Sequence, residues 1–81
     1  MTSEGFAPDR ELDLKGEVCP YTFVKTKLVL EKMEAGQVLR VLIDYPSSVD
    51  NVPRSATSEG HHILAIDQVE KGQWAIVIRK R

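Results

Sequence analysis

The spacing of apolar residues changes twice within the first 44 residues of this chain, and this change restricts the possible folds. Residues 11–15 alternate polar and apolar side chains, as in a strand, with Leu12 and Leu14 on the covered face. Residues 20–34 space their apolar side chains by three and four, which predicts an amphipathic helix. Residues 38–44 return to alternation and predict a central strand. This order predicts a right-handed βαβ unit with parallel strands.

The predicted helix has clear start and stop signals. Pro20 suits the first helical position, because an N–H there needs no partner, and Gly36 follows the last turn. The apolar residues expected to face the core are Phe23, Val24, Leu28, Leu30 and Met33. The lysines Lys25, Lys27 and Lys32 are expected to form a solvated face.

The second half of the chain predicts another helix and a hairpin. Because a proline deep inside a helix breaks a backbone hydrogen bond, we expect a loose turn from Ser48 and a helix that restarts near Pro53. Gly60 ends this helix. Residues 62–70 and 73–80 predict two strands joined by a Lys-Gly turn.

The element order is therefore βαβαββ, in a chain of 81 residues that can bury only one modest core. This predicts an α/β (α+β) two-layer sandwich, with a four-stranded mixed sheet and two helices on one face. Residues 1–9 contain Ser, Gly and Pro and predict a disordered leader, and residues 10–81 predict a single domain.

Charge and cysteine content exclude several classes of protein. Eleven Lys and Arg against twelve Asp and Glu give a net charge of −1, which argues against a dedicated nucleic-acid binder. A single cysteine excludes a disulfide framework and a multi-thiolate zinc site within one chain. No apolar segment has membrane-spanning length. We expect a cytoplasmic protein without metal, cofactor or membrane association.

Cys19 is the residue best placed to carry chemistry. It follows the first predicted strand and a short turn, directly before Pro20 at the predicted helix N-terminus. Unpaired amide groups and the helix dipole can lower the pKa of a thiol there from about 8.5 to roughly 3.5–7.5. An exposed Cys19 would be an activated nucleophile, whereas a buried one would be a small hydrophobic residue. Position alone leaves both interpretations open.

Two other residues are candidates for the rim of a site at Cys19. Asp44 follows the central strand at the sheet edge where ligand sites gather, although it also fits a plain turn and helix cap. His61 is the second candidate; it and His62 would face opposite sides of a strand and cannot share a metal. We expect both histidines to be partly solvated. Residues 79–81 are expected to form a frayed, basic tail.

The segment Leu14-Lys15-Gly16-Glu17-Val18-Cys19-Pro20, with the helix after it and Ala35-Gly36, resembles the TusA family, also called SirA-like or YedF-like. Later landmarks match in order: Asp44-Tyr45-Pro46, Asn51-Val52-Pro53, Gly60-His61 and Ile78-Arg79-Lys80. The resemblance covers residues 12–80 and implies the two-layer fold predicted above.

The resemblance also implies a function. Members of the family take up sulfur as a persulfide on the motif cysteine, here Cys19, and pass it to a partner's cysteine, for example toward tRNA thiolation. The implied partners are a cysteine desulfurase or another sulfane-sulfur donor, and an acceptor protein with a reactive cysteine. Such thiol exchange needs no cofactor. The chain would be a sulfurtransferase-type carrier more than a turnover enzyme.

The family motif is Cys-Pro-x-Pro, whereas this chain has Cys19, Pro20, Tyr21 and Thr22. Thr22 restores an amide donor that proline lacks and adds a hydroxyl. If Cys19 is the N-cap, the Thr22 amide is the donor that usually engages it. We therefore expect Thr22 to help hold the sulfur anion, and Tyr21 and Thr22 to influence partner choice.

Two other functions are compatible with the sequence. One is a regulatory module that binds RNA or protein, with Cys19 incidental. RNA binding would need exposed aromatic residues flanked by cations, so direct nucleic-acid binding is not expected. The other is a redox sensor in which Cys19 forms mixed disulfides.

Overall fold

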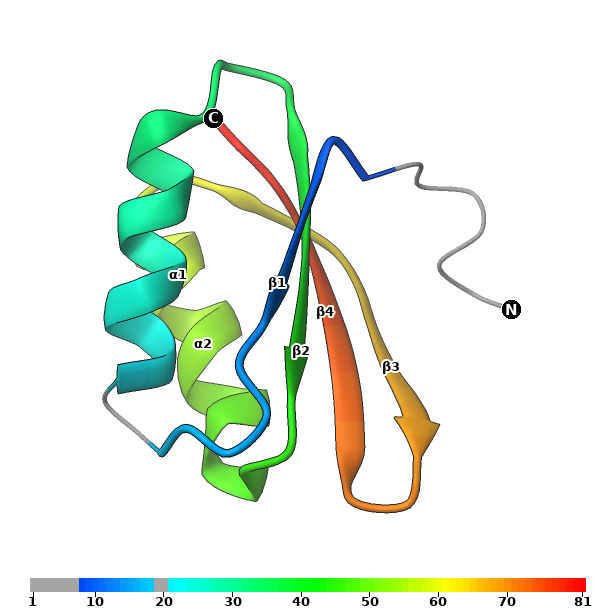
Figure 1. Cartoon of the computed structure of the whole chain (residues 1–81). Coiled ribbons are helices and arrows are strands. Elements are labelled where there is room, and N and C mark those ends of the chain that lie inside the picture. Colours follow the sequence, from blue (N-terminus) through cyan, green and yellow to red (C-terminus); the bar gives the residue numbers. More distant parts are fainter. Residues whose placement is uncertain (1–7, 19–20) are drawn as a thin grey trace.

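The computed structural model describes residues 8–18 and 21–81. Its elements are β1 Arg10–Asp13, α1 Tyr21–Lys32, β2 Val38–Ile43, α2 Pro46–Ser58, β3 His62–Glu70 and β4 Gln73–Arg79. β1 and β2 are parallel, and β4 pairs antiparallel with both β2 and β3, so the strand order is β1-β2-β4-β3. Both helices cover one face of the sheet (Figure 1). The predicted two-layer fold is confirmed.

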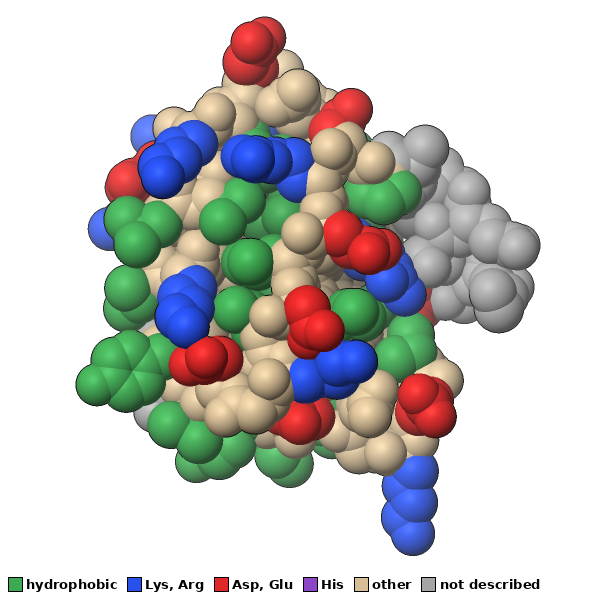
Figure 2. Space-filling model, in the orientation of Figure 1, with side chains coloured by type: hydrophobic (Ala, Val, Ile, Leu, Met, Phe, Trp, Pro, Cys, Tyr) green, Lys and Arg blue, Asp and Glu red, His purple; other side chains and the backbone are tan. Residues whose placement is uncertain are grey.

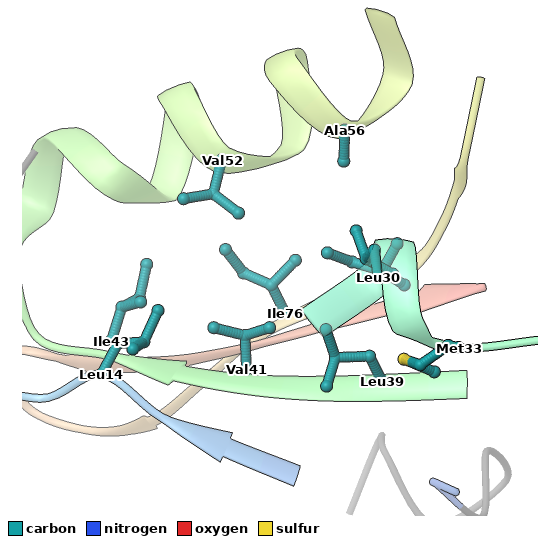
Figure 3. Close-up of a cluster of buried hydrophobic side chains, with 10 residues drawn as sticks. Leu14, Leu30, Met33, Leu39, Val41, Ile43, Val52, Ala56 and Ile76 are labelled. Atoms are coloured by element: carbon teal, nitrogen blue, oxygen red, sulfur yellow. The ribbon is translucent and has the colours of Figure 1, made fainter. Parts of the chain in front are cut away.

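The core lies between the helices and the sheet (Figure 3). The alternation predicted for β2 is confirmed, because Leu39, Val41 and Ile43 are all fully buried. β4 adds Ile76 and Ile78 to this layer. The helices close the core from the other side with Leu30, Met33, Val52 and Ala56.

The buried face of α1 differs from the predicted one. Thr22 and Thr26 are fully buried, whereas Val24 and Leu28 are exposed. Both threonine hydroxyls have partners: Thr22 Oγ1 lies 2.8 Å from Oγ of Ser48 on α2, and Thr26 donates to the Thr22 carbonyl at 2.7 Å. These hydrogen bonds offset the cost of burying the hydroxyls. The prediction that Val24 and Leu28 face the core is therefore wrong.

α2 is one continuous helix, so the predicted restart near Pro53 is wrong. The helix begins earlier, with Pro46 in its first turn, where a proline ring is tolerated. Pro53 lies inside the helix and has no amide to donate to the Val49 carbonyl four residues before it. The helix nevertheless buries Val52 and Ala56 against the sheet, and this burial offsets the missing hydrogen bond.

The basic residues at positions 79–81 are held by the fold, so the prediction of a frayed tail is wrong. The Lys80 amide donates to the Gln37 carbonyl at 2.8 Å, and the Lys80 carbonyl accepts from the Gly36 amide at 2.9 Å. The Arg81 amide donates to Nδ1 of His61 at 3.2 Å. The two bonds of Lys80 continue the β2–β4 pairing beyond the ends of both strands, and the Arg81 bond ties the end of the chain to the residue before β3.

Asp9, which the sequence assigned to the leader, is paired with the first residue of β2. Its amide donates to the Val38 carbonyl at 2.8 Å, and its Oδ2 accepts from the Val38 amide at 2.8 Å. Asp9 therefore contacts the start of β2, directly before β1 begins at Arg10. Pro8 is described and exposed, and residues 1–7 of the predicted leader lie outside the described residues.

Candidate functional site

The carboxyl ends of β1 and β2 meet at one edge of the sheet, and the loops that follow them form the candidate site (Figure 1). After β1, residues 14–18 lead toward α1, which begins at Tyr21. Gly16 makes the turn with a φ of +92°, a left-handed conformation that favours glycine. Cys19 and Pro20 stand between these segments in the chain and lie outside the described residues.

Asp44 anchors this loop from the end of β2. Its Oδ1 accepts a hydrogen bond from the Gly16 amide at 2.9 Å, across 28 positions of sequence. The Leu14 amide also donates to the Leu42 carbonyl at 2.8 Å. Asp44 is therefore beside the loop that leads to Cys19, and its carboxylate holds the backbone of that loop.

The first turn of α1 is hydrogen-bonded to the backbone of Val18. The Val18 carbonyl accepts hydrogen bonds from the Tyr21 amide at 2.8 Å and from the Thr22 amide at 3.4 Å. The Thr22 hydroxyl is buried against Ser48. The Thr22 amide and hydroxyl therefore both have partners among the described residues, and the hydroxyl joins α1 to α2. The expectation that Thr22 helps to hold the sulfur anion concerns Cys19, which lies outside the described residues, and it stays a prediction.

The side chains next to position 19 are open to solvent. Val18 is 47% exposed and Tyr21 is 59% exposed. Lys25 forms an ion pair with Glu17, with Nζ and Oε2 2.9 Å apart, across the surface of this turn. α1 has no acidic residue in its first turn, so the positive end of its dipole is not neutralised from within the helix. The start of α1 therefore favours an anion.

His61 lies at the opposite end of the sheet. His62, the first residue of β3, pairs with Arg79 at the end of β4, and Arg79 also pairs with the first residue of β2. Asp44 directly follows the last residue of β2, so it lies at the other end of the sheet. His61 is therefore not a rim residue of this site. His61 is also buried, not partly solvated as predicted, and its Nδ1 accepts a hydrogen bond from the Arg81 amide. His62 is exposed.

We expect the protein to lose stability as the pH falls below about 6.5, the usual pKa of histidine. Burial, with Lys80 and Arg81 nearby, lowers the pKa of His61 from 6.5. In this window the unfolded chain binds a proton that folded His61 does not, so stability present above pH 6.5 is lost as the pH falls through the folded pKa. Urea unfolding between about pH 7.5 and 5 measures this. A His61→Gln variant with an equally steep pH dependence would contradict it.

Within residues 8–18 and 21–81, no group of three His, Cys, Asp or Glu side chains could hold a metal ion. No helix in those same ranges is long and apolar enough to cross a membrane.

Comparisons with known proteins relate the chain to one family. The family model described as Sulfurtransferase TusA matches residues 10–80. A protein of Archaeoglobus fulgidus named "Putative sulfur carrier protein" is 50% identical over 70 residues, which are 86% of this chain and 80% of the relative. YedF of Escherichia coli, which has the same description, is 37% identical over 65 residues, 80% of this chain and 84% of YedF. The crystal structure of a SirA-like protein from Desulfitobacterium hafniense has a TM-score of 0.78 at 28% identity, and the match covers 86% of this chain and 95% of that one.

Proposed function

The chain belongs to the TusA family, and from this premise we propose that it is a sulfur carrier in which Cys19 holds the transferred sulfur as a persulfide. The observation that carries the proposal is the family match over residues 10–80, which includes the one cysteine of the chain. Relatives named as sulfur carriers at 50% and 37% identity support the same role.

The geometry around position 19 supports this proposal. Asp44 holds the loop before it, and the hydrogen bonds to Val18 fix the start of α1 after it. Because Val18 and Tyr21 are both exposed, a partner protein can reach this part of the surface.

The proposed chemistry is thiol exchange in two steps. The Cys19 thiolate attacks the terminal sulfur of a donor persulfide, one S–S bond forms as another breaks, and the donor thiolate leaves. The acceptor thiolate then attacks the terminal sulfur of the Cys19 persulfide, and the Cys19 thiolate leaves. Both steps balance without an oxidant or a cofactor. The donor is a cysteine desulfurase or another sulfane-sulfur protein, and the acceptor carries a reactive cysteine, as in tRNA thiolation.

Intact-mass measurement tests the proposed function. After incubation with a cysteine desulfurase and L-cysteine, or with inorganic polysulfide, the protein should gain the mass of one sulfur, and dithiothreitol should remove it. Alkylation of Cys19 beforehand should prevent the gain. A protein that gains no sulfur from either donor would overturn the carrier function.

We also expect the Cys19 thiol to be more acidic than an ordinary cysteine. The N-terminus of α1 favours the thiolate, so the rate of alkylation against pH should have its inflection well below about 8.5. Iodoacetamide kinetics on the native protein, compared with the urea-unfolded protein, measure the difference. A native thiol that does not react, or that titrates like the unfolded one, would contradict the prediction.

A further inference from the structure

β3 is the long edge strand of the sheet, and it carries exposed apolar side chains. Its nine residues pair with β4 on one side, and in the described part of the chain no strand lies on its other side. Ile66 and Val69 are 45% and 40% exposed. β3 contains no lysine or proline, the residues that commonly keep an edge strand from pairing with another chain. The outer edge of β3 is therefore open to a further strand.

Two irregularities in β3 limit which strand can follow this edge. The register with β4 shifts between Ile63 and Ala65, and it shifts again between Gln68 and Glu70. Because such shifts bend a strand, a straight strand from another protein fits β3 poorly. The two shifts lie on either side of Ile66, so an antiparallel second copy centred on Ile66 places bent segments beside bent segments. The shape of the edge therefore favours a second copy of the chain.

The same centre brings complementary side chains together. Ile66 meets its counterpart on the helix side of the sheet, because its neighbour on β4 is the core residue Ile76. His62 lies opposite Glu70, and two-fold symmetry forms this contact twice. Both residues belong to the face away from the helices, because their partners on β4 alternate with Ile76 along the strand. An apolar contact at the centre and opposite charges at both ends stabilise this pairing.

Charge also distinguishes this register from its neighbour. A centre on Asp67 would place two carboxylates against each other, whereas the centre on Ile66 places Asp67 opposite Ala65. Figure 2 shows Lys and Arg side chains interspersed with Asp and Glu side chains on one face of the molecule, and the net charge of the chain is −1. Two copies therefore approach each other without a strong repulsive field.

We propose that two copies of the chain pair antiparallel through β3, with Ile66 at the two-fold axis and His62 of each copy opposite Glu70 of the other. Two four-stranded sheets join into one continuous sheet in this dimer. β1 and β3 are opposite edges of the sheet, so the loop between β1 and α1, which leads to Cys19, stays open to other proteins. The dimer is compatible with the proposed sulfur carrier and does not depend on it.

Sedimentation velocity tests the dimer. Between about 1 μM and 1 mM protein, the range expected for a small interface, the wild type should change from monomer to dimer. Ile66→Lys places two ammonium groups at the axis and should weaken the dimer by about tenfold or more. Leu28→Lys is the matched control on α1, where the leucine is 52% exposed, and should leave the dimer unchanged. Circular dichroism confirms that both variants are folded.

A charge exchange tests the register. His62→Glu places a carboxylate opposite Glu70 at both ends and should weaken the dimer, and adding Glu70→Lys should restore it. A wild type that stays monomeric over the whole range would overturn the proposal and leave the edge to a strand of another protein. Dimerisation of Ile66→Lys at the wild-type level, or dissociation by Leu28→Lys alone, would overturn it as well. A double variant that does not recover the dimer would show that another contact holds the two copies.

Discussion

Replacing Ile76 by alanine should lower the free energy of unfolding by about 2–5 kcal/mol. Ile76 is fully buried on β4, opposite Val41 of β2, and belongs to the core beneath both helices. The truncation removes buried apolar surface and leaves a cavity that the surrounding side chains fill only in part. A chain of 81 residues has roughly 4–12 kcal/mol of stability at about 0.05–0.15 kcal/mol per residue, so the loss is a large share of it.

The control lies directly across the hairpin. Ile66 pairs with Ile76 in the register of β3 and β4 but is 45% exposed, so Ile66→Ala should cost about 1 kcal/mol or less. Urea unfolding followed by circular dichroism gives both values. Equal losses for the two variants would show that burial beneath the helices does not decide the stability of this sheet.

Replacing Thr22 by valine should cost about 1–3 kcal/mol, the second largest effect expected. The change keeps the shape of the side chain and removes the hydroxyl that pairs with Ser48 at 2.8 Å. Ser48 is fully buried, so its hydroxyl would lose this partner away from water. Removing both hydroxyls, as in Thr22→Val with Ser48→Ala, should cost less than the two single changes added together.

A double-mutant cycle measured by urea unfolding checks this pair, and additive losses would contradict it. The same Thr22→Val variant also tests the role of Thr22 at the site. Because its hydroxyl faces the interior and its amide is kept, the pH profile of Cys19 alkylation should not change. A shifted profile would show that the Thr22 hydroxyl acts on the Cys19 sulfur.

Local patterns predicted the elements well where the signal lay within the element itself. The alternation and the Lys-Gly turn gave β3 its bounds, 62–70, as the structure has them. The buried face of α1 could not be predicted in this way, because the burial of Thr22 depends on Ser48, 26 residues later and on another helix. The helix restart at Pro53 was predicted wrongly for a similar reason, because the packing of α2 against the sheet outweighs a local rule about proline.

The site shows the same division. Asp44 could be placed near the loop before Cys19, because parallel strands end at the same edge of a sheet. The position of His61 could not be predicted in this way, because it depends on which strands β4 pairs with, and local patterns do not specify that pairing. Once β4 lies between β2 and β3, the start of β3 is at the edge away from Asp44.

The position of β4 has a consequence for synthesis on the ribosome. β4 comes last among the elements, yet it is the strand that joins β3 to β2 in the order β1-β2-β4-β3. A nascent chain that ends before residue 73 can pair β1 with β2, but it leaves β3 unattached and one edge of β2 open to other chains. Translation therefore delivers a chain that completes its sheet only when β4 emerges, and until then chaperones have an exposed apolar strand to protect.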